Sequence, residues 1–320
     1  MIEESEWNEA AKALSAADEV VVACHVAPDG DALGSMLGLT SFLERQGKKV
    51  WRTWGSGKIQ IPPQYVSLPG IDSIVNFAET PDTPKVFVAI DCGDLRRLEL
   101  VTDRFLGAGV KINIDHHISN DHFGDINLVD PNAASSSELA YELIRRMGGV
   151  PDPDEATCFY TGIVTDTGRF QYSNASVGTL RTAAALRELG VDHERVAIDI
   201  FESSSFDYLH VLGIVLSRAR LEDGMVWSYL DQQDLGEVAL DETEDFIDVL
   251  RSVRESRLAV MLKQLPDRSY KVSLRSRGDV DVSEIAAAFG GGGHKRAAGL
   301  KLRGKPEEVV AAIKQHLKSD

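Results

Sequence analysis

The 320-residue sequence has no run of consecutive apolar residues that approaches the roughly 18 needed for a membrane helix. Its start, MIEESEWNEAAKAL, is acidic and amphipathic, whereas a secretory signal has a basic region followed by an apolar one. The three cysteines, Cys24, Cys92 and Cys158, form no C-x-x-C pair and stand alone in apolar segments. Such cysteines are typical of small buried side chains in a reducing compartment. We therefore expect a cytoplasmic protein with no structural zinc site and no membrane partner.

Positive charge is also scarce over most of the chain. The formal net charge is −16, which argues against long-range attraction to nucleic acid. The scarcity is uneven, because residues 251–320 hold 15 Lys and Arg against 8 Asp and Glu, and residues 1–250 hold 19 against 42. A basic C-terminal part and an acidic N-terminal part suit a small anionic ligand. For any single Lys or Arg, a solvated surface charge is the simpler explanation.

Strand-like apolar runs alternate with helical patterns in the first half of the chain. The runs are EVVVACHVA, KVWRTW, VFVAIDC and VKINIDHH, and the helical patterns cover about 31–46, 96–106 and 136–147. This alternation predicts an α/β domain with a parallel sheet and helices on both of its faces. A helical stretch from about 154 to 220 and a second alternation follow. We expect a first domain at 1–190, a helical linker at 191–221 and a smaller α/β domain at 222–320.

Side chains of the types that bind metal ions follow several of these strands and helices. They are His25, Asp29, Asp31, Asp91, His116 and Asp166. Because α/β sheets bind ligands beyond the carboxyl ends of their strands, we expect these groups to converge there. Four carboxylates and two imidazoles without a thiolate suit Mn²⁺ or Mg²⁺ better than a structural Zn²⁺. Six ligands are too many for one open catalytic ion, so the sequence predicts two divalent ions about 3.5–4 Å apart, an arrangement that cleaves phosphate esters.

Each of these residues taken alone has a simpler structural explanation. Asp31 follows a Pro-Asp-Gly turn and is suited to cap the next helix, and Asp91 is suited to end a strand. That explanation weakens at Asp115-His116-His117, where three titratable groups follow one apolar strand. Imidazole is the commonest protein metal ligand, and a neighbouring carboxylate can orient it. Asp166 lies in an apolar helical pattern, where an unpaired carboxylate is costly, and the following Thr-Gly predicts the end of that helix.

Five ordered segments carry a more specific signal than any single residue. They are HVAPDGDALGS, AIDCGD, IDHH, GIVTDTGRF and FGGGGHKRAAG, and they span residues 25–299. Together they resemble DHH-family phosphoesterases of the nanoRNase and PAP phosphatase type, relatives of RecJ exonucleases and of manganese-dependent inorganic pyrophosphatases. The resemblance implies two metal ions, with the ligands divided between them as His25 and Asp29 for one, Asp31, His116 and Asp166 for the other, and Asp91 as the bridge.

The resemblance also implies catalytic roles. A bridging hydroxide would attack phosphorus while the two ions and His117 neutralise charge on the phosphoryl oxygens, and Asp115 would orient the histidines. Arg169 lies three residues after Asp166 and is expected to reach the substrate, although an exposed arginine at a helix end explains it equally well. The family resemblance further implies a homodimer formed through the helical surface of the first domain.

A glycine run stands near the C-terminal end of the chain. Gly290–Gly293 expose backbone N–H groups that permit close approach of a phosphate. A flexible loop is the simpler explanation of the glycines, but the basic segment His294–Arg296 follows them and two arginines precede them. The resemblance implies a DHH-associated domain that binds the nucleotide in a cleft between the two domains. The residues expected to contact it are Arg275, Arg277, Gly291, Gly292, Gly293 and His294.

The predicted function is hydrolysis of short oligoribonucleotides to mononucleotides and of 3′-phosphoadenosine 5′-phosphate (PAP) to AMP. The acidic net charge favours short substrates, since a processive nuclease needs an extended basic channel. A phosphodiesterase for cyclic di-AMP or linear dinucleotides would use the same metal site, and the sequence leaves that alternative open. A pyrophosphatase ranks lower because the glycines and arginines suit a nucleotide. A non-catalytic nucleotide sensor would be expected to lack one of the metal-ligand residues. A purely structural α/β protein would have no metal ion to account for the six ligand-type residues.

Overall fold

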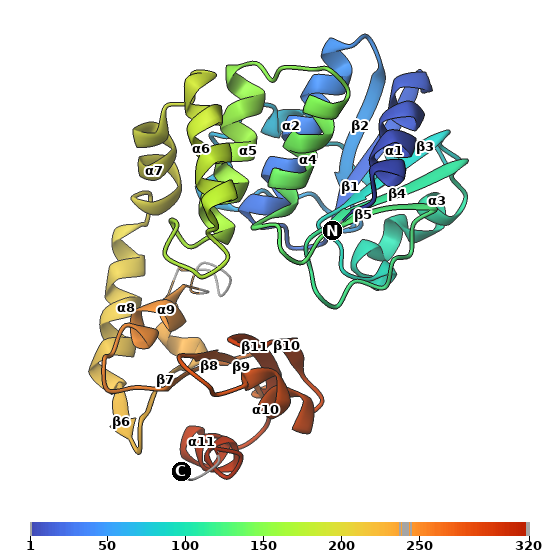
Figure 1. Cartoon of the computed structure of the whole chain (residues 1–320). Coiled ribbons are helices and arrows are strands. Elements are labelled where there is room, and N and C mark those ends of the chain that lie inside the picture. The colour runs from blue at the N-terminus through green and yellow to red at the C-terminus, as the bar shows by residue number, and fades with distance from the viewer. Residues whose placement is uncertain (1, 237, 239–242, 244, 318–320) are drawn as a thin grey trace. The chain divides into compact units, whose positions relative to one another are not determined.

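The computed structural model describes residues 2–236, 238, 243 and 245–317 of the chain (Figure 1). It forms two compact units, residues 1–203 and residues 204–320. Each unit has its own sheet, five-stranded in the first and six-stranded in the second. The predicted α/β class, with a parallel N-terminal sheet and a smaller C-terminal α/β part, is confirmed.

Unit 1 is built on a parallel sheet with the strand order β2-β1-β3-β4-β5. Its strands are β1 (Glu19–Cys24), β2 (Lys49–Trp54), β3 (Val86–Ile90), β4 (Val110–Asp115) and β5 (Ile126–Val129). The central strands β1 and β3 are buried on both faces, which explains their nearly continuous apolar sequences. The strand order reverses between β1 and β3. Such a reversal opens a crevice at the carboxyl ends of the strands, where open α/β sheets bind ligands.

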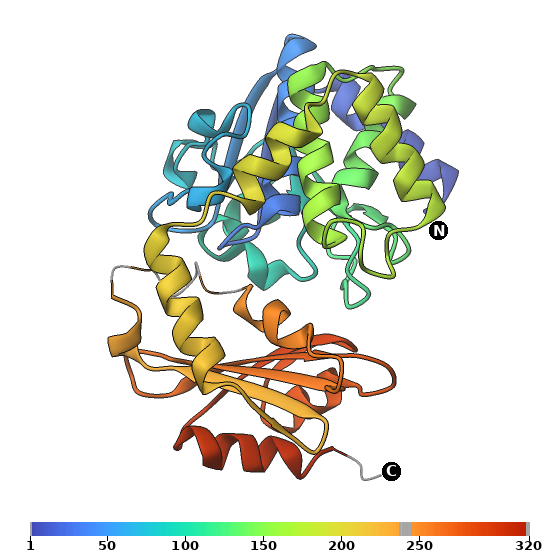
Figure 2. The same ribbon diagram turned by 90° about the vertical axis from the view of Figure 1, so that its left-hand side faces the viewer.

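Helices cover both faces of this sheet, but unequally (Figures 1 and 2). The larger layer packs on one face and contains α1 (Glu4–Ala16), α2 (Gly30–Arg45), α4 (Ser136–Arg146), α5 (Pro153–Asp166), α6 (Val177–Glu188) and α7 (His193–Phe201). The other face is covered by the 3₁₀ segment η4 (Leu95–Val101) and the short helix α3 (Thr102–Leu106). One helix was expected over 96–106, and it is broken because Glu99 has a φ of 41°. Three 3₁₀ turns connect β2 to β3, namely η1 (Pro63–Tyr65), η2 (Ile71–Ser73) and η3 (Phe77–Glu79).

Three glycines spaced four residues apart bring α2 close to α5. Gly30, Gly34 and Gly38 lie on the face of α2 that packs against α5. A Cβ atom on Gly34 would lie 2.3 Å from the backbone oxygen of Cys158, a distance that real side chains do not adopt. The absence of side chains at these positions therefore sets the spacing between the two helices, and with it the distance between Asp31 on α2 and Asp166 on α5.

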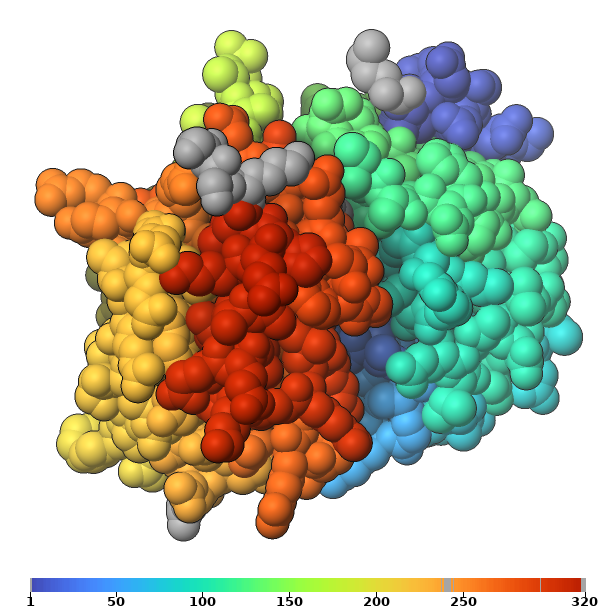
Figure 3. Space-filling model, turned by 90° about the horizontal axis from the view of Figure 1, so that it is seen from below, coloured from blue at the N-terminus to red at the C-terminus, as the bar shows by residue number. Residues whose placement is uncertain are grey.

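Unit 2 contains a mixed sheet with the order β10-β11-β9-β8-β7-β6, in which only the β7–β8 pair is parallel. The strands are β6 (Arg220–Glu222), β7 (Met225–Leu230), β8 (Leu258–Gln264), β9 (Tyr270–Ser276), β10 (Gly292–His294) and β11 (Ala297–Leu302). One face packs against α8 (Phe206–Arg218) and α9 (Phe246–Arg251), and the other against α10 (Val282–Ala288) and α11 (Pro306–Lys314) (Figure 2). The 3₁₀ turn η5 (Gln232–Asp234) follows β7. Figure 3 shows the outer surface of α11 in dark red.

In the described part of the chain, no helix is both long and apolar enough to cross a membrane. The three cysteines are buried and unbridged, as their apolar surroundings predicted. The segment expected as a linker, 191–221, contains α7 and α8. The division between the two units falls between these helices, after Ser203.

Candidate metal centre

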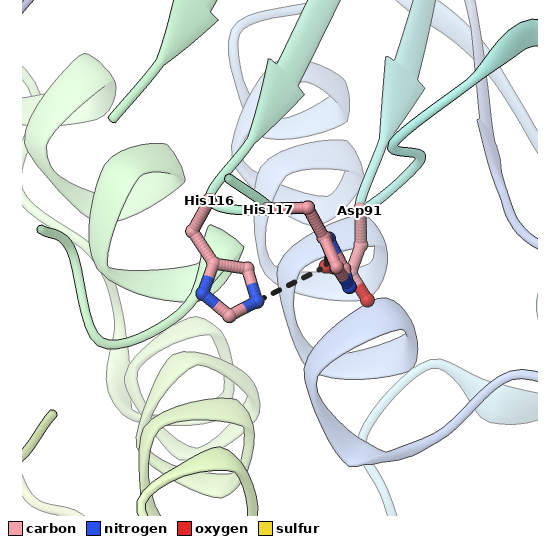
Figure 4. Close-up of side chains that lie close together, drawn as sticks. All are labelled: Asp91, His116 and His117. Carbon is pink, nitrogen blue, oxygen red and sulfur yellow. Dashed lines mark ion pairs between the residues drawn. The ribbon is translucent and has the colours of Figure 1, made fainter. Parts of the chain in front are cut away.

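The candidate metal-binding residues of unit 1 lie at the carboxyl edge of its sheet. His25 follows β1, Asp91 follows β3, and His116 follows β4. Asp91 has a φ of 58°, in the left-handed region that non-glycine residues rarely adopt. Figure 4 shows the side chains of Asp91, His116 and His117 pointing toward one another from the ends of β3 and β4. Two helix ends complete the edge, because Asp29 and Asp31 lie at the start of α2 and Asp166 is the last residue of α5.

Asp91 lies between two groups of candidate ligands. Its Oδ2 atom is 3.4 Å from His25 Nε2, and its Oδ1 atom is 3.7 Å from His116 Nε2. The His25 nitrogen is also 4.0 Å from Asp29 Oδ1. The His116 nitrogen is 3.5 Å from Asp166 Oδ2 and 4.0 Å from Asp31 Oδ2. The structure thus brings all six residues together, with one carboxylate facing both histidines.

The histidine tautomers fit cation binding. His25 Nδ1 lies 2.8 Å from the backbone oxygen of Val26, which can only accept, so Nδ1 carries the proton and Nε2 presents its lone pair to the cluster. His117 Nδ1 lies 2.7 Å from Asp115 Oδ1, a contact of the kind that fixes the orientation of an imidazole ring. Six oxygen and nitrogen donors, of which those of His25, Asp31 and Asp91 are buried, fit divalent cations.

The expected helix cap is corrected by the structure. Asp31 was expected to be suited to cap α2, but the cap is Asp29, whose Oδ1 accepts hydrogen bonds of 3.0 Å from the backbone nitrogens of Asp31 and Ala32. Asp31 is the second residue of α2, within its first turn, and is almost completely buried, with 1% of its surface exposed. Its carboxylate therefore points into the protein toward the other candidate ligands, 4.0 Å from His116 Nε2.

Electrostatic coupling gives the carboxylates of this cluster very different proton affinities. Burial raises the pKa of Asp31 to about 7, and the neighbouring charge of Asp91 adds to that effect. Burial and the charge of Asp31 raise the pKa of Asp166 well above its usual range. Burial also acts on Asp91, but its hydrogen bond with His25 and the charges of the histidines outweigh it and lower the pKa of Asp91 below its usual range. Without cations the cluster thus retains protons, which bound cations would displace.

A serine turn that was not predicted from the sequence contacts two of these carboxylates. The backbone nitrogens of Ser136 and Ser137 donate to the two oxygens of Asp31, at 2.6 and 2.9 Å. The Ser136 hydroxyl donates to Asp91 Oδ1 at 2.9 Å. Both serines are fully buried at the start of α4, where Ser135 is the N-cap. The run of three serines before a glutamate predicts the start of a helix. It does not predict contacts with carboxylates that lie 45 or more residues away in the sequence.

A network of two asparagines, Asn113 buried and Asn120 half-buried, holds Asp115 and was not predicted from the sequence. Asn120 Nδ2 lies 2.6 Å from Asp115 Oδ2 and 2.8 Å from Asn113 Oδ1. Asn113 in turn donates to the backbone oxygen of Cys92 at 3.2 Å. Asp115 is therefore bound by His117 through one oxygen and by Asn120 through the other, and a carboxylate held in this way keeps a fixed orientation.

Arg169 contacts an aromatic ring of α7 through its side chain. Its backbone has a φ of 61°, and its exposed side chain lies over the ring of Phe201, with 4.0 Å between the guanidinium carbon and the ring centre. This contact is a cation–π interaction at the end of α7. The predicted contact of Arg169 with the substrate stays a prediction.

The nucleotide-binding residues expected in unit 2 lie within strands β9 and β10 or directly next to them. Gly290 and Gly291 end α10 through hydrogen bonds to the backbone oxygens of Ala287 and Ala286. Gly292 and Gly293 belong to the edge strand β10, so a flexible loop is the wrong description of this run. The side chain of His294 lies outside what the structure describes. Arg275 Nε is 4.0 Å from Asp248 Oδ1 on α9, and Arg277 is exposed beyond the end of β9.

Known proteins and families match almost the whole chain. The profile of the DHH family N-terminal domain matches residues 19–163, and that of the DHHA1 domain matches residues 225–319. The bifunctional oligoribonuclease and PAP phosphatase NrnA of Thermus thermophilus is 34% identical over 93% of this chain and 90% of that protein. The protein of the same name from Bacillus subtilis is 28% identical over 92% of this chain and 93% of its own length.

A solved structure agrees over the full length. The crystal structure of an exopolyphosphatase-related protein from Bacteroides fragilis has a TM-score of 0.90 and 29% identity, and the match covers 98% of this chain and 96% of that one. The fold, the cluster of carboxylates and histidines at the carboxyl edge of the sheet, and these matches define a hydrolase that acts on phosphate esters. The chain belongs to the DHH family, with a DHH N-terminal domain and a DHHA1 domain.

One further relative bears on the alternative function. The cyclic-di-AMP phosphodiesterase PdeA of Listeria monocytogenes is 27% identical over 96% of this chain. The match covers only 49% of PdeA, so this chain spans about half the length of that relative. The two NrnA proteins, in contrast, are matched over nearly their whole length.

Proposed function

We propose that this chain hydrolyses short oligoribonucleotides to mononucleotides and PAP to AMP, with two divalent cations bound in unit 1. The observation that carries the proposal is the position of Asp91, whose two oxygens face His25 on one side and His116 on the other. A carboxylate with this orientation is suited to bridge two ions. The names of the NrnA relatives, which the chain matches over more than nine-tenths of its length, support the choice of substrates.

The residues divide into two ligand sets in the proposed site. We assign His25 and Asp29 to one cation, Asp31, His116 and Asp166 to the other, and Asp91 to both. When bound, the cations would lower the pKa of a water molecule and neutralise charge on the phosphoryl oxygens. Mn²⁺ is the proposed ion and Mg²⁺ the second choice, because the donors are carboxylate oxygens and imidazole nitrogens without a thiolate.

His117 is the proposed contact to the scissile phosphate. Burial lowers the pKa of its imidazole, but the hydrogen bond with Asp115 and the negative charges of Asp91 and Asp115 together outweigh burial, so the net shift favours the protonated ring. A ring that carries both protons holds one on Nδ1, toward Asp115, and can donate the other to a phosphoryl oxygen. Asp115 and Asn120 keep the ring in position for that contact.

Unit 2 is the proposed nucleotide-binding part of the chain. We infer that Arg275, Arg277, the Gly291–Gly293 segment and His294 contact the nucleotide, and that Arg169 reaches the substrate from unit 1. The ordered backbone of β10 supports this assignment, because glycines at a strand edge expose amide groups that a phosphate can approach. A cytoplasmic location and a homodimer are also proposed. The first rests on the three unbridged buried thiols, and the second on the family resemblance alone.

A cyclic di-AMP phosphodiesterase is the second candidate. It would use the same metal-binding residues, and PdeA is a relative. The match to half of PdeA is weaker support than the match to nearly all of two NrnA proteins.

Asp91→Asn tests the catalytic assignment. The variant should lose hydrolysis of a 5′-phosphorylated RNA dinucleotide and of PAP while its circular dichroism spectrum is unchanged. Asp72→Asn, at an exposed position in η2 of the same unit, is the matched control and should keep full activity. A wild-type protein that is inert with Mn²⁺ would instead indicate a nucleotide sensor.

A further inference from the structure

A cavity of about 1060 Å³ lies within unit 2, at one end of its sheet. Three loop segments line it, namely Arg254–Arg257 before β8, Arg277–Asp281 between β9 and α10, and Lys295 after β10. Residues of α10 and residues that follow α11 complete the lining, namely Glu284, Ile285, His316 and Leu317. Its volume is at the upper end of the range of about 300–1,000 Å³ that is usual for small-molecule sites. The cavity is therefore large enough to hold a nucleotide.

Two arginines stand directly beside each other in this cavity. The backbone nitrogen of Arg277 donates to the backbone oxygen of Arg257 at 2.9 Å, one position beyond the Leu258–Ser276 pair of strands β8 and β9. Like charges on directly opposite residues of neighbouring strands are destabilising. Arg254 and Lys295 line the same cavity and add two more positive charges. A bound anion would interact favourably with this group of cationic residues.

The carboxylates of the lining do not cancel these charges. Asp279, Asp281 and Glu284 also line the cavity, which leaves one net positive charge. The Asp281 carboxylate is already used as the cap of α10, because its Oδ1 accepts hydrogen bonds from the backbone and the hydroxyl of Ser283, at 3.0 and 2.5 Å. Arg254 pairs with Glu255 at 3.5 Å, but both side chains are exposed and such pairs are weak. This balance suits one phosphate group better than a polyanion.

The three segments are joined by short hydrogen bonds. The Ser276 hydroxyl donates to the backbone oxygen of Val280 at 2.7 Å, and the Val282 nitrogen donates to the backbone oxygen of Lys295 at 2.9 Å. The cavity is thus held open by the fold, which lowers the entropy lost on binding. Apolar side chains, Ile285 and Leu317 among them, form part of its wall. A wall of this kind beside cationic groups suits a nucleoside that carries a phosphate.

We propose that this cavity binds a nucleotide through its phosphate group, with Arg254, Arg257, Arg277 and Lys295 around the phosphate. The inference rests on the proposed function for the source of the ligand, since a nucleoside phosphate is both the substrate unit and the product of that reaction. It adds three cationic residues to the nucleotide contacts of unit 2 expected from the sequence. The same chemistry fits a substrate nucleotide and a free mononucleotide that acts as an effector.

Calorimetric titration of the EDTA-treated full-length protein with AMP tests the proposal. The double variant Arg254→Gln/Lys295→Gln should raise the dissociation constant for AMP by roughly tenfold or more, because contacts to a charged phosphate are lost. The dependence of binding on salt concentration should also become less steep. Arg303→Gln is the matched control, because Arg303 is exposed and lies outside the cavity lining. An unchanged dissociation constant in the folded double variant would overturn the proposal, as would a wild type that binds neither AMP nor inorganic phosphate.

Steady-state kinetics with the RNA dinucleotide distinguish the two sources. A raised KM with unchanged kcat in the double variant would assign the cavity to the substrate, and an unchanged KM with lost AMP affinity would assign it to an effector. The failures are also separable. If the wild type binds AMP through these residues but has no turnover with Mn²⁺, nucleotide binding in the cavity is supported and the proposed hydrolase function is wrong. If the wild type hydrolyses the dinucleotide and the double variant binds AMP as well as the wild type does, only the assignment of the cavity as a nucleotide site is wrong.

Discussion

The hydroxyl of Ser136 lies 2.9 Å from Oδ1 of Asp91 and donates a hydrogen bond to it. Both side chains are almost fully buried. This bond joins the first turn of α4 to the end of β3, and the backbone nitrogen of the same serine binds Asp31. One residue outside the predicted ligand set thus orients two of its carboxylates. Residues of this kind commonly determine how well a metal site works.

Ser136→Ala should lower both metal affinity and kcat by about 10–100-fold, because it removes the hydrogen bond that orients Asp91. It should also lower the free energy of unfolding by about 1–3 kcal/mol, the usual effect of leaving a buried acceptor unsatisfied. Ser137→Ala is the matched control, because its hydroxyl makes only a 3.5 Å contact and its backbone nitrogen still binds Asp31. Mn²⁺ titrations and initial rates check the effect. Equal losses in both variants would contradict the role of Ser136.

Asn120→Asp keeps the side-chain shape but replaces the donor that lies 2.6 Å from Asp115 with an oxygen. Repulsion between the two carboxylates should displace Asp115 and release His117. We expect kcat to fall by about 10–100-fold with little change in metal content, because Asn120 contacts none of the six candidate ligands in the structure.

Asn132→Asp is the control for that variant, because Asn132 Nδ2 also binds a carboxylate, Asp130, but at an exposed position. Metal content measured by elemental analysis and kcat measured on the RNA dinucleotide separate the two effects. Parallel loss of metal and activity in Asn120→Asp would show that Asn120 acts on the metal site and not on His117.

Gly34→Ala should destabilise unit 1 by about 1–3 kcal/mol, the usual range for overpacking, since the new Cβ would lie 2.3 Å from the backbone oxygen of Cys158. Activity should fall as well, because Asp31 and Asp166 move apart with the two helices. Gly213→Ala is the opposite control. That glycine lies inside α8 with nothing within 4 Å of its added Cβ, so alanine should stabilise the protein by about 0.5–1 kcal/mol. The melting temperatures of the Gly34→Ala and Gly213→Ala variants, compared with that of the wild type, check both expectations. A Gly34→Ala protein as stable as the wild type would contradict close packing of α2 against α5.

The metal-free protein should lose stability as the pH rises from about 4 to about 7. The pKa of Asp31 is raised to about 7 in the folded state and is about 3.9 in an unfolded chain, so the folded state binds more protons across this interval. Stability from this group is fully present below pH 4 and is lost as Asp31 ionises. The raised pKa values of His25 and His116 act in the same direction above pH 6.5.

Melting temperatures in EDTA from pH 5 to pH 8 check this prediction, and Mn²⁺ should restore the stability lost at the upper end. Asp31→Asn is the control, since a neutral side chain should flatten the slope of melting temperature against pH. A slope equal to that of the wild type would show that Asp31 does not titrate as its burial implies.

Much of the site was predictable because His25 and Asp91 end apolar strands that are buried on both faces, and parallel strands end at one edge. Ser136 and Asn120 were not predictable, because their contacts depend on tertiary packing and a single serine or asparagine in a turn has no periodic signal. The break at Glu99 depends on a local φ of 41° that no side-chain pattern encodes. Strand β5 was missed since it has only four residues. The glycine run was ambiguous because glycine fits a helix end and a strand edge as readily as a loop.

The most direct test is an assay of the purified protein, treated with EDTA and resupplied with Mn²⁺, Mg²⁺ or Ca²⁺, on five substrates. They are a 5′-phosphorylated RNA dinucleotide, a 24-mer RNA, PAP, cyclic di-AMP and pyrophosphate. We predict no turnover in EDTA, the fastest turnover with Mn²⁺, and a preference for the dinucleotide and PAP. Preference for cyclic di-AMP, or full activity in EDTA, would contradict the proposed short-nucleotide hydrolase.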